Sequence, residues 1–128
     1  MNGNEEKALI TELGERDFRS EVLRSKLPVL VEFWAPWSRP CQILSSALDE
    51  AASTCRGSVK VVTVNADDNP TLSLWYEIRS IPTLLFFLDG NLRGRIVGTA
   101  SKEAILAQLR AVLGGQSTES PVLPPSPQ

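Results

Sequence analysis

The chain has 128 residues, a length that suits one domain with a sizeable core. Its net charge of −2 offers no basic surface for nucleic acid, and no window approaches the roughly 20 apolar residues of a membrane-spanning helix. The first residues are polar and acidic, unlike a signal peptide, which favours a cytoplasmic location. Histidine is absent and the two cysteines lie fourteen positions apart, so we expect neither a metal site nor a cofactor.

The pattern of apolar residues predicts five strands and four helices in the order βαβαβαββα. The strands are expected at residues 9–13, 29–34, 59–64, 81–88 and 92–97. The helices are expected at residues 15–26, from 39 until Gly57, after Pro70 through Trp75 or Tyr76, and from the capping residue Ser101 to Leu113. Asp89-Gly90 predicts a hairpin, so the last two strands should be antiparallel. This order predicts an α/β protein with a mixed sheet and helices on both faces.

The two ends of the chain differ from its middle in composition. Residues 1–8 are polar and expected to be flexible, and residues 9–115 should form one domain. Residues 116–128 hold four prolines, three serines and few apolar anchors, so we expect a disordered tail.

One stretch contains the residues with the clearest chemistry. Val29–Trp34 is apolar except for Glu32, as in a strand that is buried on both faces of a sheet. Ala35-Pro36-Trp37 ends this strand, and Ser38 can cap a helix that carries Cys41 in its first turn. If both cysteines lie on this helix, its rise of about 1.5 Å per residue separates them by about 21 Å, far beyond the disulfide limit of about 7 Å.

At this junction the chain resembles the thioredoxin family, whose active site reads Trp-Cys-Gly-Pro-Cys where this chain reads Trp-Ser-Arg-Pro-Cys. Further motifs extend the resemblance over about residues 9–113, namely Phe-Trp-Ala-Pro-Trp, Val-Asn-Ala-Asp-Asp-Asn-Pro, Ile-Arg-Ser-Ile-Pro-Thr-Leu and a late Val-Gly. The resemblance implies a thioredoxin fold, in which a central mixed five-stranded sheet is flanked by four helices. It also implies a monomeric protein of thiol–disulfide redox homeostasis, with protein or peptide partners, including disulfide-containing ones.

The resemblance places Ser38 at the position of the attacking thiol and Cys41 at that of the resolving thiol. In the family, the first thiolate opens the substrate disulfide and the second thiol resolves the mixed disulfide. A serine hydroxyl is a far weaker acid than a thiol, and the chain has no histidine to activate it. We therefore interpret Ser38 as a helix cap and Cys41 as a slow, partly buried thiol. Dithiol disulfide reduction should be absent or severely impaired, and whether the chain is an enzyme stays open.

Glu32 falls at the position of the family's buried acid, which is thought to shuttle a proton for the resolving cysteine. Burial among apolar residues should raise its pKa, because ionisation of a carboxyl is unfavourable there. A purely structural role for Glu32 stays open as the alternative. The family's lysine partner of this acid would fall at Thr63, and Lys60 should face the other side of its strand. The missing lysine weakens the case for a proton relay.

Pro82 follows Ile81 as in the family's cis-proline motif, which presents backbone to a bound peptide. The resemblance implies a cis bond here, although cis accounts for only about 5–6% of such bonds in general. The substrate-binding residues that the resemblance implies are Pro36, Trp37, Arg39, Pro40, Ile81, Pro82 and Gly98. Asp67 and Asp68 are expected in a solvated turn and not as a metal pair.

Two functions fit these residues. The first is a thioredoxin-like redox protein in which Ser38 replaces the attacking cysteine. The second is a redox-inactive module that binds proteins or peptides in the groove beside Pro82. Arg39 in place of the family's glycine, and Thr63 in place of its lysine, favour natural divergence over a single exchange of cysteine for serine.

Removal of residues 116–128 should leave folding intact, because a segment of this composition cannot bury enough apolar surface to offset the entropy of ordering it. The melting temperature of the chain truncated after Gly115 should stay within about 2 °C of that of the full chain. A substantially lower melting temperature would show that the tail docks on the domain.

Overall fold

The structure, a computed structural model, describes residues 9–115, so the expectations for residues 1–8 and 116–128 lie outside the described residues. Five strands form one sheet, namely β1 (Ile10–Leu13), β2 (Val29–Trp34), β3 (Lys60–Asn65), β4 (Thr83–Leu88) and β5 (Asn91–Val97). The helical segments are α2 (Glu15–Phe18), its π-helical continuation η1 (Arg19–Leu23), α3 (Arg39–Thr54), α4 (Pro70–Trp75) and α5 (Lys102–Leu113). With α2 and η1 counted as one helix, the five strands and four helices confirm the predicted α/β class.

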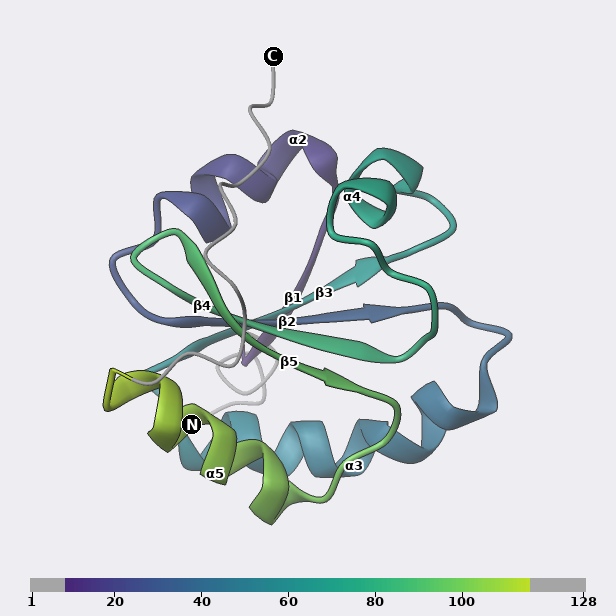
Figure 1. The fold of residues 1–128 in the computed structure, drawn as a ribbon. Helices are drawn as coiled ribbons and strands as arrows, with labels where there is room; N and C mark the ends of the chain where they lie inside the picture. The colour runs from purple at the N-terminus through teal and green to yellow at the C-terminus, as the bar shows by residue number, and fades with distance from the viewer. Residues whose placement is uncertain (1–8, 116–128) are drawn as a thin grey trace, which may run out of the picture.

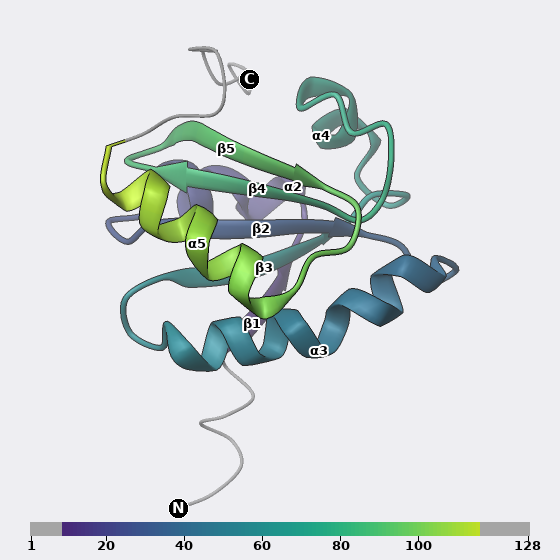
Figure 2. The same ribbon diagram turned by 60° about the horizontal axis from the view of Figure 1, so that its bottom comes forward.

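The strands lie in the order β1-β3-β2-β4-β5, which places β2 in the middle of the sheet. β2 runs parallel to β3 and antiparallel to β4, and β4 is antiparallel to β5, as the hairpin signal predicts. Figures 1 and 2 show α2 and α4 on one face of the sheet and α3 and α5 on the other. These three layers confirm the prediction of helices on both faces.

β2 is buried on both faces, as its apolar sequence predicts. Val29, Val31 and Phe33 lie in the core beneath α2 and α4, whereas Leu30 lies in the core beneath α3 and α5. Each of these four side chains is at most 1% exposed. Burial of one such side chain stabilises a fold by about 1.5–3 kcal/mol. A shift of β2 by one residue would exchange the two sets, so the register of the strand is fixed.

The first helix is shorter than predicted and changes type along its length. The sequence predicts one helix over residues 15–26, whereas in the structure α2 passes into η1, which ends at Leu23. In η1 the backbone N–H of Arg24 donates to the carbonyl of Arg19 at 2.9 Å, a spacing of five residues. Beyond it, the Ser25 hydroxyl accepts from the Leu27 N–H at 3.1 Å. This local turn replaces the last predicted turn of helix.

The later elements lie close to their predicted positions. α3 ends at Thr54, three residues before Gly57, and β4 begins at Thr83 and not at Ile81. Ser101 caps α5 as predicted, since its hydroxyl accepts from the backbone N–H of Ala104 at 3.1 Å. Within residues 9–115, no helix is both long enough and apolar enough to cross a membrane.

Gly90 lies in the turn between β4 and β5 with φ +79°, and a Cβ at this position would lie 2.5 Å from the carbonyl oxygen of Leu23. Gly90→Ala should therefore lose about 1–2 kcal/mol from the positive φ, and more from the clash with the end of η1. Gly57→Ala is the matched control, because Gly57 has φ +84° and its Cβ would meet nothing within 4 Å. Urea unfolding should show the larger loss for Gly90→Ala, and equal losses would contradict the close contact.

Candidate functional site

The candidate site lies at the end of the sheet where β2 and β3 finish and β4 begins. Because β2 and β3 are parallel, the loops that follow them leave from the same edge of the sheet. β4 is antiparallel to β2, and its first residue, Thr83, pairs with Phe33 near the end of β2. Residues from three segments, 37–40, 66–67 and 78–81, therefore line one groove at this edge.

Ser38 caps the N-terminus of α3, as the sequence predicts. Its Oγ accepts a hydrogen bond from the backbone N–H of Cys41 at 3.3 Å, and its own backbone is extended. Ser38 is 2% exposed and Cys41 is 6% exposed, so both side chains are buried at the start of the helix. The positive end of the α3 dipole lies at position 38, where it would favour a negative charge.

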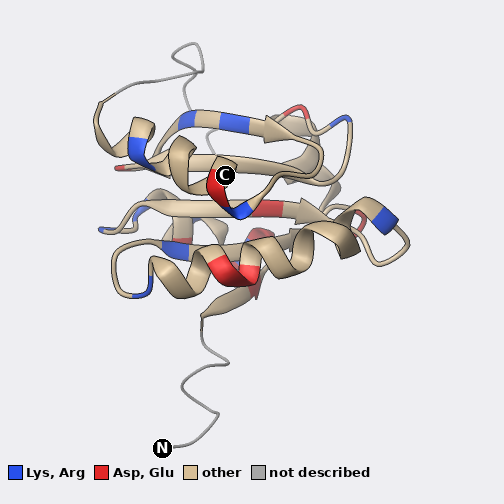
Figure 3. Ribbon diagram, turned by 90° about the horizontal axis from the view of Figure 1, so that it is seen from below, with Lys and Arg blue, Asp and Glu red and all other residues tan. Residues whose placement is uncertain are grey.

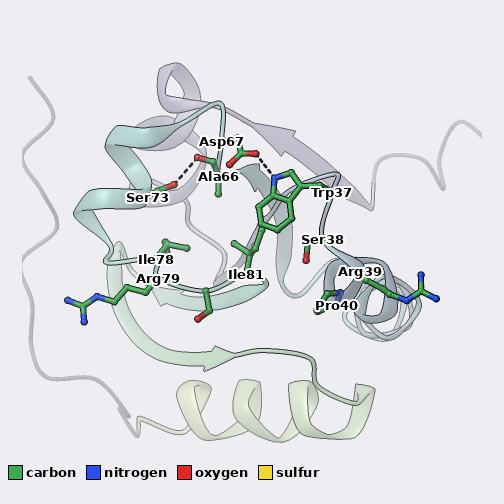
Figure 4. A pocket seen from close by; sticks show the side chains of 11 residues that line it. Trp37, Ser38, Arg39, Pro40, Ala66, Asp67, Ser73, Ile78, Arg79 and Ile81 are labelled. Carbon is green, nitrogen blue, oxygen red and sulfur yellow. Dashed lines mark hydrogen bonds between the residues drawn. The ribbon is translucent and has the colours of Figure 1, made fainter.

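A hydrogen bond joins the loops that follow β2 and β3. The indole Nε1 of Trp37 donates to Oδ2 of Asp67 at 2.7 Å, across 30 positions of sequence (Figure 4). Asn65 holds the second loop, since its Oδ1 accepts from the backbone N–H groups of Asp67 and Asp68 at 2.9 and 3.2 Å. The sequence predicts only a solvated turn here, because a local pattern gives no sign of a contact between distant loops. The bond fixes Trp37, which is nonetheless 69% exposed.

A groove of about 530 Å³ lies between the start of α3, the loop after β3 and the loop before β4 (Figure 4). The predicted site residues in its lining are Trp37, Ser38, Arg39, Pro40 and Ile81. Its other lining residues, which had no predicted part in the site, are Ala66, Asp67, Ser73, Ile78, Arg79 and Ser80. Arg79 belongs to the Ile-Arg-Ser-Ile-Pro motif, and this proximity to Ile81 is the signal that could have identified it.

The Ile81–Pro82 peptide bond is cis, and the Pro82 carbonyl accepts from the backbone N–H of Gly98 at 2.8 Å. Pro82 is buried, whereas Ile81 is half-buried and lines the groove. The Thr83 hydroxyl donates to the Ser80 carbonyl at 2.6 Å and so holds the loop before β4. Pro82 and Gly98 are thus paired with each other, and Ile81 is the member of this group that reaches the groove.

Glu32, Pro36 and Cys41 line a second pocket, of about 410 Å³, together with residues from the first two turns of α3. Burial and, to a smaller extent, the negative charge of Asp49 raise the pKa of Glu32 to about 7. This direction confirms the sequence prediction. The Glu32 carboxyl can therefore hold or release a proton near neutral pH, in the same pocket as the Cys41 thiol.

The neighbour of Glu32 on β3 is Thr63, which lies opposite it in the parallel register. Lys60 forms an ion pair with Glu21 at 3.0 Å and donates to the Glu21 carbonyl at 2.9 Å. The pairing of Thr63 with Glu32 and the ion pair of Lys60 with Glu21 agree with the prediction that Lys60 faces away from Glu32. The neighbour that β3 supplies to the Glu32 carboxyl is therefore a threonine and not a cation.

The two cysteines are free thiols at opposite ends of α3, which confirms that they do not pair with each other. Cys41 is buried in the first turn, and Cys55 is half-buried at the C-terminal cap. Burial raises the pKa of the Cys55 thiol, so less of it is thiolate at neutral pH.

The active-site part of the resemblance to a redox family rests on one arrangement. A buried central strand leads into a helix that has a cysteine in its first turn. A sequence model of that family, described as Thioredoxin, matches residues 9–111, and the chain therefore belongs to the thioredoxin family. It is 42% identical over 100 residues to the thioredoxin of Pyropia yezoensis, a match that covers 78% of this chain and 94% of the relative. It is 48% identical over 88 residues to thioredoxin 1 of Synechococcus elongatus, a match that covers 69% of this chain and 82% of the relative. The chain is thus a thioredoxin-like redox protein with the thioredoxin fold.

The raised pKa of Glu32 should make stability fall as pH rises. A folded-state pKa of about 7, above the ordinary value of 4.5, means that the folded protein holds this proton more tightly than the unfolded chain. Below the lower value the carboxyl is protonated in both states, and above the higher value it is ionised in both. As the pH rises from the unfolded-state pKa to the folded-state pKa, the wild-type chain should lose about 3 kcal/mol of stability that a chain with a neutral side chain at position 32 would keep.

Glu32→Gln removes this titration, so its free energy of unfolding should rise relative to wild type by about 3 kcal/mol between about pH 4 and pH 8, as measured by urea unfolding. Asp49→Asn is the matched control. It removes the smaller cause of the shift, so the fall should end at a lower pH and be smaller, without being abolished. A difference between Glu32→Gln and wild type that stays constant with pH would show that Glu32 titrates normally.

Proposed function

We propose that the chain serves thiol–disulfide redox homeostasis as a cytoplasmic monomer with protein or peptide partners. In this proposal Ser38 replaces the attacking cysteine, so that dithiol disulfide reduction is absent or severely impaired. The observation that carries the proposal is the hydrogen bond from the Cys41 N–H to the Ser38 Oγ, because this hydroxyl acts as a helix cap.

Within residues 9–115, the Ser38 hydroxyl accepts from the Cys41 N–H and donates to no base. The chain has no histidine, and the Glu32 carboxyl lines the other pocket, with Cys41. Asp67 shares the groove with Ser38, but one of its oxygens accepts the hydrogen bond from Trp37. A serine hydroxyl without a base is a poor nucleophile, so a hydrolytic role for Ser38 is not supported.

A thiol introduced at position 38 would occupy a site suited to a thiolate. Its sulfur could accept the Cys41 N–H as the hydroxyl does, and the α3 dipole would lower its pKa. The guanidinium of Arg39, one residue further on, would favour the thiolate as well. The restored disulfide should therefore be somewhat more oxidising, because a stabilised reduced form raises the potential.

The restored reaction would be a two-electron exchange. The thiolate at position 38 attacks one sulfur of the substrate disulfide, whose S–S bond breaks, and the other substrate sulfur leaves as a thiolate. The Cys41 thiol gives its proton to Glu32 in the shared pocket, and its sulfur attacks the sulfur at position 38. The second substrate sulfur then leaves as a thiolate, and the chain ends with a disulfide between positions 38 and 41.

Insulin reduction with dithiothreitol as the electron donor tests the proposal. The chain should show no more activity than Cys41→Ser, because the attacking thiolate is missing in both. Ser38→Cys should exceed both by at least roughly 100-fold, as expected when a nucleophile is restored. Adding Cys41→Ser to that variant should abolish turnover again. Activity of the unmodified chain above that of Cys41→Ser would refute the proposal.

A second candidate function is a redox-inactive module that binds peptides in the groove beside Pro82. The observation that favours it is the exposed Trp37 ring, which Asp67 holds in place without any contribution from a thiol. If Ser38→Cys folds, forms the disulfide between positions 38 and 41 and still reduces no insulin, the binding function takes the place of the first.

A further inference from the structure

The groove carries more positive than negative charge, on a chain whose net charge is −2. Its lining includes Arg39 and Arg79 but only one acid, Asp67. One oxygen of Asp67 accepts the hydrogen bond from Trp37. Both arginines are exposed, and neither makes a hydrogen bond or an ion pair within residues 9–115. The groove therefore offers two guanidinium groups to an anionic ligand.

The two arginines lie on opposite sides of the groove and belong to different segments of the chain. Arg39 is the first residue of α3, and Arg79 lies in the loop between α4 and β4. Figure 4 shows them on opposite sides of the groove, with Trp37 and Ile81 between them and both side chains extending outward. A ligand that reaches both must therefore cross the groove as an extended segment. The α3 dipole adds positive potential on the side of Arg39.

Acidic groups weaken this potential unequally. Glu77 is exposed and lines an adjoining pocket together with Arg79 and Asp67. Exposed charges interact over about 10 Å at 0.1 M salt, so a carboxylate that lines the same pocket as Arg79 should weaken the potential there, although no ion pair joins the two in the described part of the chain. On the other side, acidic residues lie in the middle of α3, away from the basic residue at its start (Figure 3). Arg39 should therefore contribute more than Arg79.

We propose that the groove selects an extended acidic segment of a partner protein, with carboxylates on both sides of an apolar centre. The apolar centre lies on Trp37 and Ile81, and the carboxylates pair with Arg39 and Arg79 through the forked guanidinium geometry. The inference rests on the proposed function, because it names the class of protein partner for the same groove. An exposed arginine–carboxylate pair changes an affinity by up to about fivefold, so the two arginines select among partners that the apolar centre already binds.

Fluorescence anisotropy on the full chain tests this selection with labelled peptides of one length. The acidic peptide has a Leu-Ser-Leu centre with two glutamates on each side. Two control peptides, called the glutamine twin and the lysine twin, carry glutamine or lysine in place of all four glutamates. The acidic peptide should bind roughly tenfold more tightly than the glutamine twin at low salt, and the lysine twin should bind least well. The advantage of the acidic peptide should shrink at about 0.5 M salt, because the charges are exposed.

Arginine variants assign the preference to the groove. Arg39→Gln should reduce the advantage of the acidic peptide about fivefold, and Arg79→Gln about twofold, with little change for the glutamine twin. Arg24→Gln is the matched control. It removes the same charge from an exposed arginine at the end of η1, beside the β4–β5 turn and therefore at the other end of the sheet. This control should leave the advantage intact.

Equal binding of the acidic and glutamine peptides would overturn the inference, as would no binding of the acidic peptide up to about 1 mM. An equal loss of preference in Arg24→Gln and Arg39→Gln would also overturn it, since net charge alone would then explain the preference. The peptides contain no cysteine, so these outcomes are independent of insulin reduction, which tests the proposed function itself.

Discussion

The structure depends on the pairing of β2 along both of its edges. β3 occupies one edge and β4 the other, and side chains from helices cover both faces of the strand. A strand held in this way cannot slide, because a shift by one residue would turn each buried set toward the wrong core. The residue at which β2 ends therefore determines where α3 begins and which loops can reach it. The groove is a consequence of this register.

The first turn of α3 divides the two positions of the family's redox pair between two pockets. Ser38 lines the groove with Trp37, whereas Cys41 lines the pocket that holds Glu32. The position that would meet a partner is thus separated from the group that can hold a proton. The positive charge of the groove comes from exposed guanidinium groups. In the pocket, burial is the main cause that raises the pKa of Glu32 to about 7. One helix start serves both pockets, because Ser38 is its N-cap and Cys41, three positions further on, lies in its first turn.

Local patterns in the sequence were sufficient for the order of the elements and for the residues in and next to β2. The buried strand and the Ser38 cap follow from neighbours in the chain, and the apolar residues around Glu32 were enough to predict the direction of its pKa shift; the contribution of Asp49 on α3 was not predicted. The hydrogen bond between Trp37 and Asp67 could not be predicted, because it joins loops that only the parallel pairing of β2 and β3 brings together. The π-helix η1 was missed because the periodicity of apolar residues does not distinguish it from a regular helix.

The cap at Ser38 bears on what an exchange of cysteine for serine does to the fold. A single nucleotide change can convert a cysteine codon to a serine codon, and the hydroxyl of serine caps α3 at this position through its bond to the Cys41 N–H. The exchange of cysteine for serine should therefore have little effect on folding. A chain in which serine takes the place of cysteine at this position can therefore keep both its fold and its groove, and substitutions at the rim of the groove can then change which partners it binds.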